Sequence, residues 1–458
     1  MQGLYSRFKK FVEKKQLIPN SASLVVGVSG GVDSVTLLEL LLRYKREKRT
    51  IGKFRVAHFN HSTRHGKSDL DENLVKAICE NKNLPLESKK ANIPKIAQSS
   101  HKSFEMVARE ERYKFFNSIT GKNELIATGH TLDDQVETIL LRFIRGTGLN
   151  GISGITPKYK NRIKPLLFAQ KQTLYNWADR EGLRYREDHT NYENHCLRNV
   201  VRNKLIPTIR KDINPGYRKS IHHLSQIAQE TNNYLEKKAN NLAPELIIDH
   251  SSWFYALNFE KLKSLHTVEI KYILLEICRR IKEHTTVGYD QFNQFMDQLH
   301  RKNEGQILKL DSDIWTNFDR NQVIIYNKDQ QNWKSAKIIP GEKLDSETFE
   351  IITEKLDKSK VDFKKDSNIE YLDLAKIKGN LIIRHWKEGD VFTPLGLQHH
   401  KKLSDYFIDN KIPKYKKHHI PILVNKGKIL WICGERLSEK FKITSTTKDI
   451  LKLKYIQK

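Results

Sequence analysis

The chain has 458 residues and a formal net charge of +27, from 81 Lys and Arg against 54 Asp and Glu. A chain of this length can bury a sizeable core and form about two to four domains. The basic excess indicates a polyanionic partner, either nucleic acid or an anionic membrane surface, although a solvated lysine-rich surface would also account for it. No apolar run reaches the length of about 18 residues that a transmembrane helix needs, so none is expected.

The four cysteines lie far apart and form no Cys-x-x-Cys pair. This usage fits the reducing cytoplasm, where we expect the protein, and it offers no zinc or iron–sulfur site. Residues 1–17 lack the apolar core of a secretion signal and predict a short amphipathic helix instead. The cysteines are Cys79, Cys196, Cys278 and Cys433.

A strand, a glycine turn and a helix follow. Residues 24–28 are apolar and β-branched, as in a buried parallel strand, and helical spacing of apolar residues begins at Ser34. Glycines in between allow the backbone to approach a phosphate, which the N–H groups of the next helix would bind. Asp33 is placed to hold Mg²⁺ beside the phosphates. The pattern predicts a nucleotide site formed by Ser29, Gly30, Gly31, Val32, Asp33 and Ser34.

Strands then alternate with helices, which predicts a doubly wound parallel sheet of the α/β class. Further strands are expected at 54–60, 84–87 and 124–128, and helices at 69–81, 103–119 and 132–145. His58 and Asn60 end the second strand, at the edge where such sheets bind ligands, so we expect them to contact the nucleotide.

Three carboxylates, Asp133, Asp134 and Glu137, follow His130 at the start of the helix over 132–145. Acidic residues in a first helical turn are often caps that the helix dipole stabilises. Three of them close to a histidine are more than one cap requires. They are therefore also candidates to bind an ammonium group, hold Mg²⁺ or act as a general base.

Arg109 and Arg112 lie on the polar side of the helix over 103–119. They are placed to clamp a carboxylate or phosphate, or else they form a solvated helix face. A helix over 170–182 and a basic helix from Arg198 to 205 follow, and Pro207 and Pro215 bracket a domain boundary.

The pattern predicts three domains. Residues 1–214 form the sheet domain, and residues 215–375 form a mainly helical middle domain with β-like runs from Gly305. Residues 376–458 form a small α+β domain, with short strands at 381–385, 420–424 and 429–433.

The hexapeptide Ser29–Ser34 resembles the PP-loop of the ATP pyrophosphatases, which cleave ATP between its α- and β-phosphates. Together with further motifs, it makes the chain similar to the tRNA(Ile)-lysidine synthetase family. The resemblance is weak over 216–375, and His399-His400 departs from a more glycine-rich stretch of the family. The matching segments are 58–61, 108–113, 128–138, 145–148, 164–167, 187–199 and 389–436.

The resemblance implies a defined reaction that uses ATP and Mg²⁺. L-lysine is ligated to C2 of the wobble cytidine of tRNA(Ile) with the CAU anticodon. ATP first adenylates the cytidine and releases pyrophosphate, and the lysine amine then displaces AMP. No membrane partner is expected, and a homodimer is one alternative for the oligomeric state.

The resemblance also implies roles for the residues. Asp33 would support Mg²⁺, and one of Asp133, Asp134 and Glu137 would hold the lysine ammonium and accept its proton. Arg109 or Arg112 would bind the lysine carboxylate, and His130 and Arg198 would be further substrate contacts. The C-terminal domain would bind tRNA.

Three alternatives remain. Another PP-loop tRNA-modifying enzyme, such as a thiolase, would need cysteines that this chain does not group together. An amidotransferase-type PP-loop synthetase would not explain a charge of +27. A non-catalytic RNA-binding protein would explain the charge but not the hexapeptide together with the carboxylates.

Overall fold

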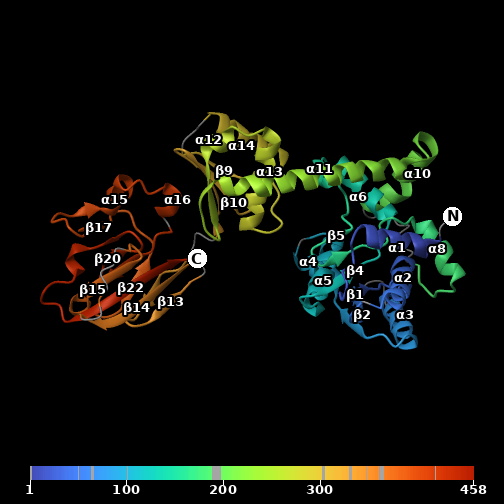
Figure 1. Cartoon of the computed structure of the whole chain (residues 1–458), viewed down its shortest axis with the longest axis horizontal. Coiled ribbons are helices and arrows are strands. Elements are labelled where there is room, and N and C mark those ends of the chain that lie inside the picture. The colour runs from blue at the N-terminus through green and yellow to red at the C-terminus, as the bar shows by residue number, and fades with distance from the viewer. Residues whose placement is uncertain are drawn as a thin grey trace. The chain divides into compact units, whose positions relative to one another are not determined.

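A computed structural model (Figure 1) describes residues 3–49, 51–62, 67–100, 102–187, 197–301, 305–329, 333–346, 348–358, 361, 366–417 and 419–458. It divides into two compact units, residues 1–233 and 234–458. The division into three domains at 214 and 375 stays a prediction. In the described part of the chain, no helix is both long and apolar enough to cross a membrane. Cys196 and most of segment 187–199 lie outside the described residues.

The first unit is built on a six-stranded sheet of order β3-β2-β1-β4-β6-β5. The first five strands of this order run parallel, and only β5 is antiparallel to its neighbour. The chain passes outwards from the central β1 in both directions, which confirms the predicted doubly wound sheet. The strands are β1 (Ser23–Gly27), β2 (Phe54–Asn60), β3 (Leu86–Lys90), β4 (Glu124–Ala127), β5 (Lys158–Tyr159) and β6 (Arg162–Ile163).

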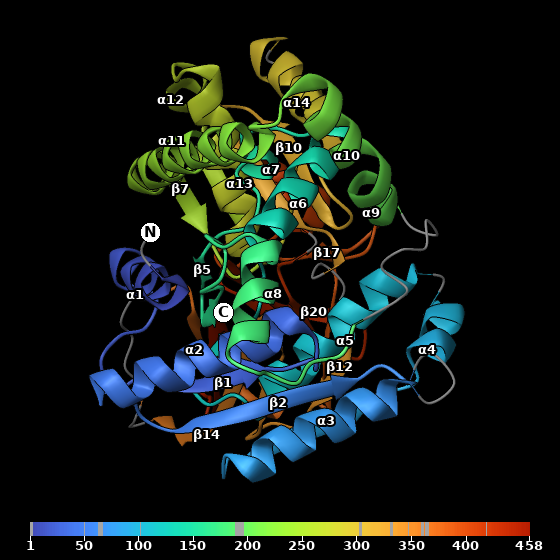
Figure 2. The ribbon, with the colours of Figure 1, turned by 90° about the vertical axis from the view of Figure 1, so that its right-hand side faces the viewer.

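Helices cover both faces of this sheet (Figure 2). Leu24 and Val26 of β1 pack in one core with α1 (Leu4–Lys14), α2 (Val32–Lys48), α3 (Lys67–Asn81) and α8 (Lys171–Arg180). Val25, which points to the other face, packs with α4 (Ile93–Ser100) and α5 (Phe104–Ile119). Burial on both faces explains why the strand is a continuous apolar run rather than an alternating one.

Most predicted elements of this unit appear within a few residues of their predicted bounds. The strand at 86–90 was expected at 84–87, because four of its five residues are exposed at the sheet edge and carry no apolar pattern. The helix after the glycine turn begins at Val32, so Asp33 lies in its first turn.

The predicted basic helix over 198–205 is longer than expected and runs through Pro207. It starts as α9 (Leu197–Val200) and continues through α10 (Ile206–Thr208) and two π-helical turns, Val201–Leu205 and Ile209–Ile213. A proline within a helix has no N–H to donate, and wider turns relieve its clash with the preceding carbonyl. The predicted end of the helix at residue 205 is therefore wrong, because the helical segment continues to Ile213.

The second unit contains a five-stranded sheet whose core packs against three shorter helices and against the last turns of the long helix over 217–246. Two of its strands, β7 (Ile247–His250) and β8 (Phe254–Asn258), lie in a region predicted as helical and polar. They are short, and β7 carries charged and half-exposed residues, so neither has a strong strand pattern. The other strands are β9 (Ile307–Lys309), β10 (Ile314–Asp319) and β11 (Gln322–Asn327), and the helices are α12 (Phe259–Lys263), α13 (Thr267–Ile281) and α14 (Tyr289–Arg301).

The C-terminal part of this unit is antiparallel, with two main sheets of order β12-β16-β19-β20-β21 and β13-β14-β22-β15. The strands predicted at 381–385, 420–424 and 429–433 correspond to β16 (Leu381–Arg384), β19 (Ile422–Asn425) and β20 (Lys428–Ile432). Short helices, α15 (Leu403–Asp409) and α16 (Lys414–Lys417), complete the α+β character. The remaining strands are β12 (Ala336–Ile338), β13 (Lys343–Asp345), β14 (Phe349–Asp357), β15 (Ile369–Asp373), β21 (Arg436–Leu437) and β22 (Asp449–Gln457).

The first part of α11 (Tyr217–Leu246) belongs to the first unit by its contacts. The Arg218 guanidinium donates to Asp133 Oδ1 at 2.8 Å. Gln135, which is buried, donates to Ser225 Oγ at 3.3 Å, and Gln229 donates to the Ser153 carbonyl at 2.6 Å. The sheet domain is therefore complete only when residues up to about Asn233 are present.

We predict that a fragment of residues 1–233 unfolds cooperatively and at a higher urea concentration than a fragment of residues 1–215. The shorter fragment loses three polar contacts that are partly or fully buried, which corresponds to roughly 2–4 kcal/mol. Urea unfolding followed by circular dichroism measures the difference. Equal midpoints would show that α11 adds nothing to the stability of the sheet domain.

Candidate active site

The glycine turn after β1 is tied to the first turn of α2 by its two serines. The Ser29 N–H donates to Ser34 Oγ at 3.1 Å, and Ser34 Oγ donates to the Gly31 carbonyl at 2.9 Å. Gly30 has φ +90°, a conformation that L side chains rarely adopt. Gly31 is the residue before α2 and provides no side-chain cap, so the helix presents its N-terminus to the loop as an anion site.

The end of β4 lies directly against this loop. A Cβ atom at Gly129 would be 3.1 Å from the carbonyl carbon and oxygen of Asp33 and 3.2 Å from the Ser34 nitrogen. These contacts are tighter than nine in ten real Cβ contacts, so a larger residue would require the loop to shift by a few tenths of an ångström. The close approach brings His130 and the start of α6 (Leu132–Ile144) next to the phosphate loop.

The Asp33 carboxylate has few partners that compensate its charge. Its Oδ1 is buried without a hydrogen-bond partner, and its Oδ2 lies 3.7 Å from Lys171 Nζ. Burial raises the pKa of the Asp33 carboxyl to about 6, although Lys171 opposes the shift. An unpartnered carboxylate oxygen fits a metal ligand. The described residues contain no group of three or more His, Cys, Asp and Glu that could hold a metal ion. The residues thus fit Mg²⁺ held by one carboxylate and by substrate phosphates.

His58 and Asn60 lie at the expected end of β2, and their hydrogen bonds serve the protein itself. His58 Nδ1 lies 2.8 Å from the Val28 carbonyl, so Nδ1 donates and Nε2, which is buried without a partner, is the acceptor. Burial lowers the pKa of His58. Asn60 donates to Asp69 and Glu72 and accepts from the Ser62 N–H, which ties the end of β2 to α3. The contact of His58 and Asn60 with the nucleotide stays a prediction.

The three predicted carboxylates share the first turns of α6, and Asp134 also caps the helix. Asp134 Oδ2 accepts from the Thr131 N–H at 2.8 Å, and Thr131 Oγ1 accepts from the Asp134 N–H in return. Asp134 Oδ1 accepts from Arg198 at 2.8 Å. Burial alone would raise the pKa of Asp134, but Arg198 and His130 outweigh it and hold that pKa below its usual range.

The other two carboxylates are paired with arginines as well. Glu137, whose side chain is only 3% exposed, accepts from Arg198 at 2.7 Å and from Arg202 at 2.9 Å. Asp133 accepts from Arg218 and, at 2.7 Å, from the Lys171 N–H at the start of α8. Breaking such pairs would leave charges uncompensated at a largely buried site, so the arginines hold these two carboxylates in place.

Cationic side chains, Arg112 and Arg109 among them, also lie near His130. Arg112 Nε is buried without a partner, and burial lowers the pKa of Arg112. Arg109 is exposed, and its guanidinium stacks 5.1 Å from the ring centre of Tyr113. Burial lowers the pKa of His130 to about 4, against the opposing charge of Asp134, so the imidazole is neutral at physiological pH. A buried guanidinium nitrogen without a partner fits an anionic ligand.

Comparison with known proteins decides the family. A model described as the PP-loop domain matches residues 2–209, and one described as the TilS substrate C-terminal domain matches residues 381–453. A tRNA(Ile)-lysidine synthase of Caldanaerobacter subterraneus subsp. tengcongensis is 31% identical, and the alignment covers 99% of this chain and 98% of the relative. A relative of the same name from Clostridium perfringens is 31% identical, and the alignment covers 97% of this chain and 97% of the relative. One from Persephonella marina is 32% identical, and the alignment covers 97% of this chain and 98% of the relative.

The chain belongs to the tRNA(Ile)-lysidine synthase family. Membership confirms the resemblance that the motifs indicated, and the PP-loop domain implies the use of ATP.

In this lysidine synthase family member, sequence reasoning missed four cations of the site. Lys171, Arg202 and Arg218 contact the acids described above. Lys164 is buried and donates to the Thr156 carbonyl at 3.1 Å. Burial and the charges of Arg109 and Arg162 lower the pKa of Lys164 to about 8. Two of these cations could have been found from the sequence, because Lys164 opens one of the matching segments and Arg202 lies four residues after Arg198 on the same helix side. No sequence feature places Lys171 or Arg218 in the site.

We predict that Asp33→Asn stabilises the fold at pH 7.5 while it abolishes turnover. The folded state raises the pKa of Asp33, so ionisation costs stability as the pH rises from the unfolded value of about 3.8 through about 6. The shift corresponds to at most about 2 kcal/mol, because a quarter of the side chain is exposed. Urea unfolding at pH 7.5 and pH 5 should show a gain that shrinks at the lower pH.

Asp212→Asn, at an exposed position of the same unit, serves as the control and should change neither midpoint. Equal stability of Asp33→Asn and the parent chain at pH 7.5 would contradict the desolvation of Asp33.

Proposed function

We propose that this chain catalyses ATP-dependent formation of lysidine on tRNA(Ile). The observation that carries the proposal is the meeting of the PP-loop with the α6 carboxylates across Gly129, in a chain that is similar over its whole length to proteins named tRNA(Ile)-lysidine synthase. The C-terminal family domain and the charge of +27 support an RNA substrate.

The proposed reaction has two steps. The C2 carbonyl oxygen of the wobble cytidine, in the CAU anticodon, attacks the α-phosphate of ATP, and the bond to pyrophosphate breaks. The ε-amine of L-lysine then attacks C2 and expels AMP. The lysine ε-ammonium first gives one proton to a carboxylate of the site, which makes the nucleophilic amine, and the nitrogen loses a second proton to the departing AMP or to solvent as the bond from C2 to the AMP oxygen breaks.

The phosphate loop would serve the first step. The N-terminus of α2 and the backbone of Gly30 and Gly31 would hold the leaving pyrophosphate, since N–H groups aimed at an anion stabilise the charge that develops there. Asp33 would hold Mg²⁺, and a bound Mg²⁺ neutralises charge on the phosphates. Lys171, near Asp33, adds a positive charge at the same place.

The second step needs a neutral amine and a site for the amino acid. We propose that one of Asp133, Asp134 and Glu137 holds the lysine ammonium and accepts its proton. Arg198 contacts two of these acids, so it would orient them rather than touch substrate. For the lysine carboxylate we favour Arg112 over Arg109, because Arg112 Nε is buried without a partner whereas Arg109 is exposed.

A base within an anticodon loop can be splayed into such a pocket, while basic side chains bind the phosphates on either side of it. Residues 376–458 are proposed to bind tRNA outside the anticodon. A cytoplasmic location and a homodimer stay predictions from the sequence.

We predict that pyrophosphate release requires the tRNA with its target cytidine but not lysine. ATP activates the base in the proposed order of steps, so lysine acts only afterwards. Release should be measured with each substrate omitted in turn, and the tRNA should be analysed by mass spectrometry. Release that depends on lysine but not on tRNA would overturn the order of steps, and an unmodified tRNA after complete turnover would overturn the proposed function.

We also predict that Arg112→Gln raises the KM for lysine tenfold or more and leaves lysine-independent pyrophosphate release unchanged. Loss of one charge-assisted hydrogen bond costs about 1.5–3 kcal/mol, which corresponds to that range. Arg109→Gln is the matched control on the same helix and should change the KM less than threefold. A larger effect at Arg109 would assign the carboxylate to that residue instead.

A further inference from the structure

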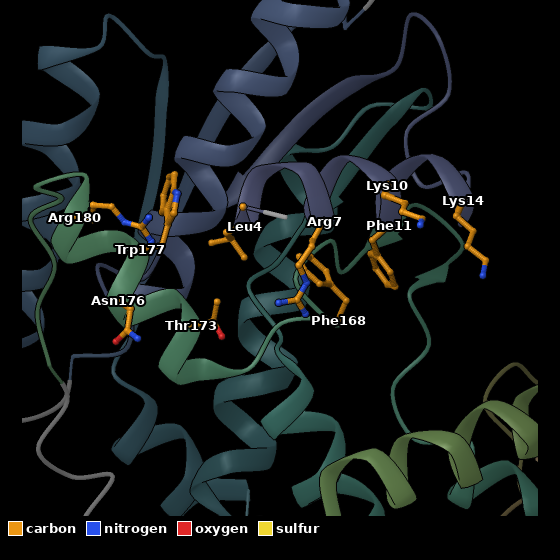
Figure 3. Close-up of a pocket in the computed structure, with 11 residues that line it drawn as sticks. Leu4, Arg7, Lys10, Phe11, Lys14, Phe168, Thr173, Asn176, Trp177 and Arg180 are labelled. Atoms are coloured by element: carbon orange, nitrogen blue, oxygen red, sulfur yellow. The ribbon is translucent and has the colours of Figure 1, made fainter. Parts of the chain in front are cut away.

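A groove of about 840 Å³ lies between α1 and α8, within the first unit (Figure 3). Its cationic side chains are Arg7, Lys10, Lys14 and Arg180, and its apolar floor includes Phe168 and Trp177. We call it the α1–α8 groove. None of the residues described above as part of the active site lines it.

Among the residues that the structure describes, the four cations of the groove have no anionic partner. No described carboxylate forms an ion pair with any of them, and no acidic residue lines the groove. The other side of α1 differs, because Lys9 pairs with Glu47 there, and Glu13 lies 2.7 Å from Lys48. Since Arg7, Lys10 and Lys14 are three and four residues apart, they form one stripe of positive charge along the helix.

The floor of the groove combines aromatic rings with one of these cations. The ring centres of Phe11 and Phe168 are 5.3 Å apart, and the Arg7 guanidinium lies 5.3 Å from the centre of the Phe168 ring. Trp177 is only 7% exposed. Stacking on Phe168 orders the Arg7 side chain. Cations beside aromatic surfaces are the combination that binds single-stranded nucleic acid.

The groove begins next to the active site. The Lys171 N–H, at the start of α8, donates to Asp133, and Lys171 Nζ lies 3.7 Å from Asp33. Thr173, two residues further along the helix, already lines the groove. Because residues two apart on a helix face different sides, a polymer whose reacting unit lies at the carboxylates would have to pass around the first turn of α8 to reach the groove.

The charges are also spread out rather than gathered at one point. Figure 3 shows Arg180 at one end of the groove, Lys10 and Lys14 at the other, and Arg7 with Phe168 between them. A single phosphate needs converging donors, whereas a chain of phosphates matches cations in a row.

We propose that the α1–α8 groove binds the phosphodiester backbone of the RNA substrate, beside the nucleotide held in the active site. This proposal rests on the proposed function. It adds a binding surface on the catalytic unit itself, apart from the C-terminal part of the chain.

The test is a variant of the full-length chain that carries Arg7→Gln, Lys10→Gln and Arg180→Gln. The control carries Arg46→Gln, Lys53→Gln and Lys122→Gln, which remove the same charge from exposed positions outside the groove, near the end of α2 and just before β2 and β4. Equilibrium binding of tRNA(Ile) transcript is measured from 50 to 300 mM salt. The groove variant should bind tenfold or more weakly at about 100 mM salt, with a salt slope smaller by about two, and the control should change less than threefold.

A second measurement uses the unaltered protein. Acetylation of lysines with and without tRNA, followed by mass spectrometry, should show protection of Lys10 and Lys14 but not of Lys53 and Lys122. This result does not depend on the folding of any variant. ATP binding should be equal in the parent chain and both variants.

Several results would overturn the proposal. Parental tRNA affinity in the groove variant, or unprotected Lys10 and Lys14, would show that RNA does not occupy the groove. Weaker binding of ATP with unchanged binding of tRNA would assign the groove to a free nucleotide. A changed sedimentation coefficient of the groove variant would assign it to a second copy of this chain. If the parent chain itself neither binds nor modifies tRNA(Ile), the proposed function fails instead.

Discussion

The contact between Gly129 and the Asp33–Ser34 peptide is the constraint on which the site depends. It exists because β1 and β4 are neighbours in the sheet and both end at the same edge. A Cβ at this position would lie 3.1 Å from the Asp33 carbonyl, so a larger residue would require the two segments to move apart by a few tenths of an ångström. Through it, the phosphate loop and the first turn of α6 become one site, although about one hundred residues separate them in the chain.

Placing so many acids together has an electrostatic cost, which the protein offsets with arginines. Glu137 is almost completely buried and accepts hydrogen bonds from Arg198 and Arg202, and Arg218 serves Asp133. Asp33 is the exception, because its nearest cation is 3.7 Å away and one of its oxygens has no partner. The acid left least compensated is the one that faces the phosphate loop, as expected if a cation arrives there with the substrate.

The arginine partners also connect the site to the segment that leaves the sheet domain. Arg198 and Arg202 lie on the helix with π-helical turns, and Arg218 lies on α11, which continues into the second unit. π-helical turns are often found at functional sites, where they place side chains that a regular helix would not. A change in this segment would reach the carboxylates directly.

The amino-acid sequence by itself determined the doubly wound sheet, the phosphate loop and the edge at which His130 and the acids lie. These features depend on apolar runs, glycines and helix starts, and each involves residues within a few positions of one another. Asp134 shows the limit of such reasoning. Its position predicted both a cap and a catalytic acid, and the structure shows the cap, whereas the catalytic role stays a prediction.

Only the tertiary structure decided which charges meet. Arg218 pairs with Asp133 across 85 residues, and α1 and α8 line one groove although more than 150 residues separate them. No local pattern encodes these contacts, because they depend on how helices pack over a sheet. The same holds for Asp33: its position in the loop follows from the sequence, but its raised pKa depends on burial by elements far away in the chain.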